Sequence, residues 1–203
     1  MQNIARALIL GLALLYAGLS PAAPNPAAVA VVDKLHETLI GVMKRAGTLG
    51  YQGRYRTLAP VVNGSFDFPR IAEIVLGRNW KDLNPEQRNA FTDLFIKLST
   101  ATYAARFDDF DNEVFRHVSD QTLRGNQVLI KTEIVKADGE AVTLDYILQD
   151  KGGKWLIVNV IADGVSDLSL KRADYTAVLK GQGFDALVVK LKQKIAVYEA
   201  GEP

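Results

Sequence analysis

The chain contains no cysteine and only two histidines, His36 and His117, among its 203 residues. Without cysteine there is no disulfide, no thiolate metal ligand and no thiol nucleophile, so stability must come from packing. Neither histidine has a third metal ligand beside it at the spacing of a metal motif. We therefore expect a structural or surface role for both, with no metal site, no cofactor and no catalytic residue.

The chain also lacks a strong net charge. It has 24 basic and 23 acidic residues, a formal net charge of +1 at pH 7. This balance creates no field that would gather nucleic acid or an anionic membrane by charge alone. Nucleic acid is therefore not an expected partner.

The apolar run near the N-terminus is too short to cross a membrane. It extends from Ala7 to Leu19, whereas a spanning helix needs ~20 apolar residues. Arg6 precedes the run, and small residues and prolines follow it, which is typical of a secretory signal. We predict a signal peptide over residues 1–22 and an exported single domain over residues 23–203.

Apolar residues at helical spacing predict about six helices. The strongest start signal is Asn84, followed by Pro85 and then by Gln87, the pattern of a capping box. Asp67 likewise precedes a helix that has Pro69 in its first turn. The expected helices span residues 26–46, 51–62, 67–77, 85–107, 168–180 and 184–198.

Between Val114 and Asp163 the hydrophobic period changes from that of a helix to two. Val128 and Ile130, for example, alternate with Leu129. The turn signals RGN, ADGE and DKGGK separate consecutive runs. Short turns favour a four-stranded antiparallel meander, and the order helices, sheet, helices indicates an α+β fold.

The last predicted strand, residues 154–162, is apolar on both faces. Strand alternation places Trp155 and Ile157 on one face and Leu156 and Val158 on the other. A layer of helices can cover one face, and the other can border a cavity that an apolar ligand fills. Periodicity alone does not separate such a cavity from ordinary core.

Two polar motifs near these elements have structural interpretations. DGVSDLS is not a G-x-S-x-G elbow and has no histidine nearby to activate Ser166, so we expect Ser166 or Asp167 to cap the following helix. FDDFD, residues 107–111, lacks the glycine and terminal glutamate of a calcium loop. It is expected to be a solvated helix end.

Three stretches of the chain carry a family resemblance. They are FDFPRIAEIVLGRNWKDLNPEQRNAFTDLFIKLSTATYA, VTLDYILQDKGGKWLIVNVIADGVSDLSLKRADY and GFDALVVKLKQK. Together they contain F-D-F, L-G-x-x-W, P-E-Q, T-Y-A, D-Y, K-W, G-V-S and G-x-D-x-L at characteristic intervals. In this combination the chain resembles the MlaC, or toluene-tolerance, family of periplasmic lipid carriers. DGVSDLSLKRADY is most similar to a branch of that family associated with hopanoid biosynthesis.

The resemblance implies a fold and a function. It implies a sheet wrapped by helices, with an apolar lipid cavity between sheet and helices and the lipid headgroup outside. It also implies a periplasmic shuttle that carries phospholipid, or a hopanoid-type lipid, between the inner and outer membranes. The implied partners are an inner-membrane MCE-domain protein of an ABC transporter and an outer-membrane lipid-transfer partner.

The candidate lipid-binding residues combine apolar faces with motif positions, and Arg172 is expected near a phosphate at the mouth of the cavity. They are Leu94, Leu98, Tyr103, Val128, Ile130, Leu144, Tyr146, Trp155, Ile157, Val165, Leu168 and Arg172.

Two other functions fit the same residues. One is an isomerase or hydrolase that uses an aspartate such as Asp145 as base in an apolar pocket. The other is a non-catalytic interaction protein with a filled core and no ligand. An Asp145 side chain that points inward would favour the enzyme.

Overall fold

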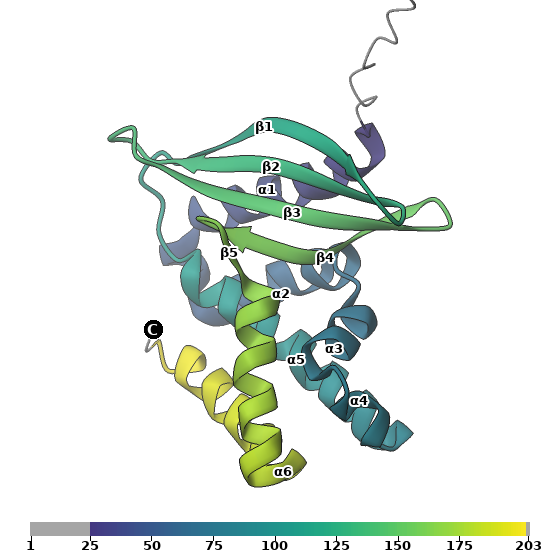
Figure 1. Cartoon of the computed structure of the whole chain (residues 1–203). Coiled ribbons are helices and arrows are strands. Elements are labelled where there is room, and N and C mark those ends of the chain that lie inside the picture. The colour runs from purple at the N-terminus through teal and green to yellow at the C-terminus, as the bar shows by residue number, and fades with distance from the viewer. Residues whose placement is uncertain (1–24, 202–203) are drawn as a thin grey trace, which may run out of the picture.

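The computed structural model describes residues 25–201, so the predicted signal peptide lies outside the described residues. No helix in the described part is long and apolar enough to span a membrane. The helices and strands of this part, labelled in Figure 1, are α1 (Pro26–Met43), α2 (Ala46–Ser65), α3 (Phe68–Leu76), α4 (Asn79–Asp82), α5 (Pro85–Arg106), β1 (Val114–Leu123), β2 (Gln127–Val135), β3 (Ala141–Lys151), β4 (Lys154–Ala162), β5 (Val165–Ser166) and α6 (Asp167–Glu199).

The sheet is an antiparallel meander in the order β1-β2-β3-β4-β5. The α+β class and the antiparallel meander are therefore confirmed, but the predicted number of four strands is wrong. The fifth strand exists because Asp163 and Gly164 both have positive φ, 47° and 77°. Such a pair makes a tight hairpin turn, which returns the chain along β4 and pairs Ala162 with Val165.

The helices cover one face of the sheet (Figure 1). α1 packs against β2 and β4, while α2, α3 and α6 pack against β4, and α5 packs against α2, α3 and α6. The covered face carries Val128 and Ile130 of β2, paired with Leu148 and Tyr146 of β3, and all four are buried. Lys131, on the alternate face of β2, is exposed. The alternation of the sequence therefore matches a sheet covered on one side.

The predicted helix caps are confirmed by their hydrogen bonds. Asn84 and Gln87 form the reciprocal capping box at the start of α5. The Asp67 side chain accepts a hydrogen bond from the Arg70 backbone N–H at 3.3 Å. Ser166 caps α6 by accepting from the Ser169 N–H at 3.1 Å. These local signals set the point at which each helix begins.

The count of about six helices is confirmed, although three of the helices, α2, α4 and α6, differ from the prediction. The predicted helices 168–180 and 184–198 belong to α6, which is interrupted at Gly183 (φ 83°, ψ −178°). α4 is a single turn that hydrophobic periodicity did not indicate. α2 starts earlier than predicted because it contains a kink at Gly50, where φ is 56°. Glycine permits both interruptions, since other residues rarely adopt these angles.

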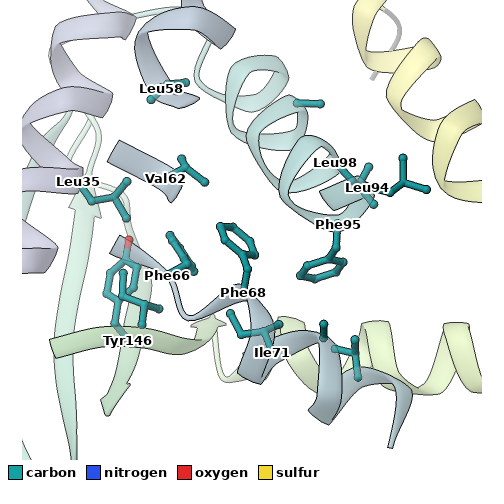
Figure 2. Close-up of a cluster of buried hydrophobic side chains, with 14 of the residues drawn as sticks. Leu35, Leu58, Val62, Phe66, Phe68, Ile71, Leu94, Phe95, Leu98 and Tyr146 are labelled. Carbon is teal, nitrogen blue, oxygen red and sulfur yellow. The ribbon is translucent and has the colours of Figure 1, made fainter. Parts of the chain in front are cut away.

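The core is centred on aromatic side chains between the sheet and the helices (Figure 2). Phe68 lies between Phe66 and Phe95, with ring centroids 5.5 Å and 6.0 Å away. His36 of α1 is also buried here, and its Nε2 lies 2.9 Å from the Tyr146 hydroxyl. The structural role expected for His36 is therefore confirmed.

Candidate functional site

A cavity of about 320 Å³ lies between the sheet, α3, α5 and the first turn of α6. Its lining comes from four parts of the chain that are distant in sequence. The lining residues are Phe66, Phe68, Ile71, Phe95, Ser99, Thr102, Tyr103, Arg106, Phe107, Leu144, Val158, Asn159, Val160, Ala162, Val165, Asp167, Leu168, Leu170 and Lys171.

The inner wall of the cavity is aromatic. The Phe66 ring lies 6.0 Å from that of Tyr103, which stacks on Phe107 at 5.7 Å. Phe68 and Phe95 extend this wall toward the core, as Figure 2 shows. Apolar pockets with a few polar groups are typical of small-molecule sites. The wall is therefore suited to the apolar part of a ligand.

A bulge in β4 shapes the sheet side of the cavity. β3 and β4 change register between Leu148, which pairs with Ile157, and Ile147, which pairs with Asn159. Val158 is the extra residue, and it lines the cavity together with Asn159. Strict alternation had placed Val158 and Asn159 on opposite faces. A bulge re-aims side chains in this way and is common beside functional sites.

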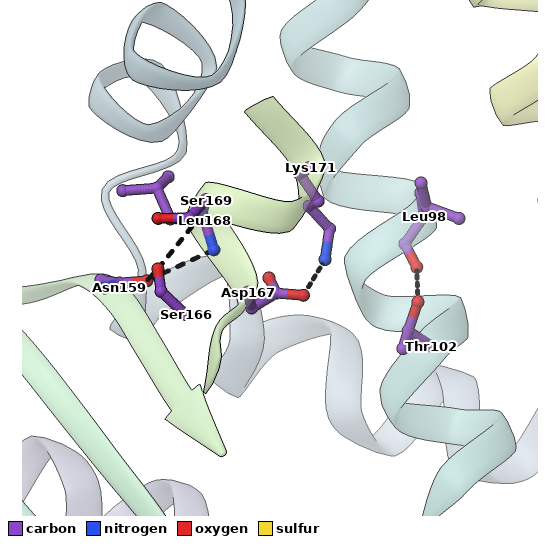
Figure 3. Close-up of polar contacts among 8 residues, drawn as sticks. All are labelled: Leu98, Thr102, Asn159, Ser166, Asp167, Leu168, Ser169 and Lys171. Atoms are coloured by element: carbon purple, nitrogen blue, oxygen red, sulfur yellow. Dashed lines mark hydrogen bonds and ion pairs between the residues drawn. The ribbon is translucent and has the colours of Figure 1, made fainter. Parts of the chain in front are cut away.

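Asn159 ties the start of α6 to the sheet (Figure 3). Its Oδ1 accepts hydrogen bonds from the Ser166 hydroxyl at 3.1 Å and from the Leu168 N–H at 3.3 Å. Ser166 in turn caps α6 through Ser169. One amide side chain of the cavity wall therefore fixes the helix whose first turn closes the cavity.

The mouth of the cavity combines exposed apolar and charged side chains. Val165 is 50% exposed and Leu170 is 60% exposed, although both line the cavity. Asp167 forms an ion pair with Lys171 one turn along α6, and Arg106 lines the mouth from the end of α5. Contiguous exposed apolar patches mark ligand-binding grooves and docking surfaces.

Burial raises the pKa of the Tyr103 hydroxyl, which keeps it protonated at neutral pH. The negative charge of Asp167 raises this pKa further, and the positive charge of Arg106 lowers it. Both charges therefore act on the same phenol.

A family model described as MlaC protein matches residues 33–193, well over half of the chain. The chain belongs to the MlaC protein family. This confirms the family resemblance, whereas the assignment to the hopanoid-associated branch stays a prediction.

Two relatives of this MlaC-family chain are informative. The intermembrane phospholipid transport system binding protein MlaC of Haemophilus influenzae is 31% identical over 123 residues. The match covers 59% of this chain and 58% of the relative, less than two thirds of its length. The solved structure of the phospholipid-binding protein from Ralstonia solanacearum, in complex with a phospholipid, matches with a TM-score of 0.74 at 22% sequence identity. That match covers 86% of this chain and 97% of the other, and shows a shared fold.

The structure brings four of the residues predicted from the sequence of this MlaC-family chain into the cavity lining: Tyr103, Leu144, Val165 and Leu168. The other eight lie elsewhere. Six of these eight are buried members of the hydrophobic cluster, and Trp155 is partly buried against that cluster; the six are Leu94, Leu98, Val128, Ile130, Tyr146 and Ile157. Arg172 lies with its guanidinium against Gly77, where an added Cβ would be 3.2 Å from Nη2.

Sequence reasoning missed most of the aromatic wall. Asp67 was correctly predicted to cap a helix, which begins at Phe68, but neither Phe66 nor Phe68 was predicted to line a cavity. The chain before α3 runs along β4. The Asp67 N–H donates to the Ile157 carbonyl at 2.9 Å, and Phe66 bridges to Ile157. The F-D-F-P pattern was the available signal, because the proline restricts the preceding residue and an aspartate cap begins the helix only after the first phenylalanine.

Asp145, the base of the enzyme alternative, does not line the cavity. It is half-buried on β3, and its Oδ1 accepts a hydrogen bond from the Thr132 N–H at 3.2 Å. An isomerase or hydrolase with Asp145 as its base would need this carboxylate in the cavity. Its position on β3 therefore does not favour the enzyme.

Proposed function

We propose that this MlaC-family protein is a non-enzymatic lipid carrier that moves phospholipid between the inner and outer membranes through the periplasm. The observation that carries the proposal is the aromatic cavity with a charged, partly apolar mouth. Its walls suit acyl chains, and its mouth suits a headgroup that stays in water. The relatives support the proposal, since one is named for phospholipid transport and the other was solved with a phospholipid.

The energetics of acyl burial imply transfer by direct contact. Burying about 30 methylenes of a two-chain lipid at roughly 0.8 kcal/mol each gives on the order of 20 kcal/mol, before losses from ordering. Escape of such a lipid into water is very slow. The carrier therefore needs partners that accept the chains directly, and we propose the MCE-domain protein of an inner-membrane ABC transporter and an outer-membrane lipid-transfer partner.

The cavity must widen to take a whole phospholipid. A volume of about 320 Å³ is near the lower end of the range for drug-sized ligands, roughly 300–1,000 Å³. The first part of α6 is the element suited to move, because Gly164 precedes it and Gly183 ends it, both at positive φ. Hinges of this kind absorb large backbone changes at a few residues.

Native mass spectrometry of the protein purified gently from the periplasm tests the proposal. We expect one copurified phospholipid per chain and a polypeptide mass that lacks the signal peptide, residues 1–22. A polycyclic lipid in its place would assign the ligand to the hopanoid type. If no lipid copurifies and the protein also extracts none from phospholipid vesicles, the carrier proposal is wrong and an interaction protein is favoured.

A further inference from the structure

Most polar groups in the cavity lining already have partners inside the protein. The Thr102 hydroxyl donates to the Leu98 carbonyl at 2.8 Å, and the Asn159 oxygen accepts two hydrogen bonds. Asp167 and Lys171 pair with each other, as Figure 3 shows. Among the described residues, the polar side chains of the lining without a hydrogen bond or ion pair are Ser99, Tyr103 and Arg106. Arg106 is the one of these three that carries a charge.

Arg106 differs in this respect from Lys171, the other cation of the lining. Within residues 25–201 it forms no ion pair, and its guanidinium donates no hydrogen bond. Arg106 lies in the last turn of α5, where the helix dipole favours a positive charge. The dipole would be satisfied equally well by a lysine, so it does not explain why an arginine stands here. The forked donor of arginine matches the oxygens of a phosphate.

The charged side chains of the cavity lining carry one net positive charge. Arg106 and Lys171 are cations and Asp167 is the single carboxylate of the lining. Asp167 holds Lys171 at the mouth through their ion pair. A phosphodiester carries one negative charge, so it would balance this group.

We infer that Arg106, with Lys171 beside it, forms a phosphate subsite at the cavity mouth that selects lipids with a phosphodiester headgroup over neutral lipids. The inference rests on the proposed function, because the acyl chains hold the headgroup at the mouth. It assigns to Arg106 the role that the sequence suggested for Arg172, whose guanidinium packs on Gly77 instead.

Competitive lipid uptake tests the subsite. The mature protein is mixed with vesicles that contain equal amounts of phosphatidylglycerol and diacylglycerol with identical acyl chains, and the bound lipids are quantified by mass spectrometry. We expect Arg106→Gln to lower the ratio of bound phosphatidylglycerol to diacylglycerol about tenfold, the size of one charge-assisted hydrogen bond at an exposed site. Arg56→Gln, an exposed arginine of α2 outside the lining, is the matched control and should keep the wild-type ratio.

Four further results separate the alternatives. Raising the salt concentration should lower the wild-type ratio, a test that needs no variant, and a ratio insensitive to salt would overturn the subsite. An unchanged ratio in Arg106→Gln, or a fall in Arg172→Gln alone, would also overturn it. Inorganic phosphate added to the lipid-free protein should not bind measurably, and saturable binding would assign the mouth to free phosphate. If the wild type extracts neither lipid, the proposed function itself fails and the subsite falls with it.

Discussion

At the scale of single residues, His36 joins α1 to the sheet at the cost of burying a titratable group. Its ring stacks on Phe115 with centroids 3.8 Å apart, and its Nε2 meets the Tyr146 hydroxyl. Burial lowers the pKa of His36 from 6.5 to about 4. The neutral imidazole is therefore part of the packing between α1, β1 and β3.

Acid should destabilise the protein through His36. The unfolded chain binds a proton near pH 6.5, whereas the folded chain binds it only near pH 4. The stabilisation is therefore complete above pH 6.5 and is lost as the pH falls toward 4, by roughly 3 kcal/mol in the free energy of unfolding. Urea denaturation across this range should show a shallower pH dependence for His36→Gln than for the wild type. His117→Gln, at an exposed position of β1, is the control, and equal slopes for wild type and His36→Gln would contradict the expectation.

Substitutions at Ile130 and Val165 can distinguish a core position from a cavity position. Ile130 is fully buried in the core, while Val165 is half exposed at the cavity mouth. Ile130→Trp should overpack the core and lower the free energy of unfolding by roughly 1–3 kcal/mol. Val165→Trp should fold normally and reduce lipid uptake, because the ring occupies space in the mouth. Thermal unfolding and bound lipid are measured on both variants, and normal uptake by Val165→Trp would remove Val165 from the proposed site.

The sequence could identify the residues at the cavity mouth better than those on its wall. Val165 and Leu168 were predicted because a turn and a helix cap follow the apolar strand. Ile130 and Tyr146 were predicted on the same grounds as Leu144, since all three lie on the apolar face of a strand. Which of these meets a cavity depends on the helices packed above that face, and periodicity contains no information about them.

At the scale of elements, the start of α6 is held by few bonds. Asn159 supplies two of them, to Ser166 and to Leu168, from a bulged strand that also lines the cavity. The helix then continues to Gly183, where the backbone adopts angles accessible essentially to glycine alone. Glycines bound this segment on both sides, so it can move as a unit once the Asn159 contacts and the packing of Tyr175 against Phe91 and Phe95 are broken.

Removing the Asn159 anchor should accelerate lipid exchange. Asn159→Ala deletes both acceptor contacts, so we expect a loss of roughly 1–2 kcal/mol in the free energy of unfolding and faster uptake of fluorescent phospholipid from vesicles. Asn159→Asp keeps an acceptor oxygen near the start of α6, where negative charge is favourable. It should therefore exchange lipid at close to the wild-type rate. Equal exchange rates in all three proteins would show that the start of α6 does not gate the cavity.

Element boundaries show where local sequence signals suffice. The caps at Asp67 and Asn84 were predicted correctly because each motif satisfies backbone N–H groups within one turn. The two-residue strand β5 and the bulge at Val158 were not predicted. Both depend on how β4 pairs with its neighbouring strands. Because β4 is apolar on both faces, its sequence has no alternation that would reveal a change in this pairing.

At the scale of the whole molecule, the hydrophobic core and the cavity lining share apolar residues. The chain has no cysteine, and its described helices share one hydrophobic cluster with the sheet. Phe66, Phe68 and Phe95 belong to that cluster and also line the cavity. A bound lipid would extend the core rather than occupy a separate compartment, so exposing the lipid to water would uncover part of the core at the same time.

This shared surface leads to a kinetic prediction for transfer. If the lipid left through water, its rate of departure would not depend on the acceptor, and the burial energy would make that rate very slow. If the acceptor must contact the mouth, the transfer rate should rise in proportion to acceptor concentration. We expect the transfer rate to rise with acceptor concentration when protein loaded with fluorescent phospholipid is mixed with increasing amounts of acceptor vesicles.

Two variants of α6 test whether the mouth makes this contact. Leu170→Ser removes an exposed apolar side chain of the mouth and should lower the slope of transfer rate against acceptor concentration. Val189→Ser changes a comparably exposed residue of α6 outside the lining and should leave that slope unchanged. A rate independent of acceptor concentration would exclude transfer by contact.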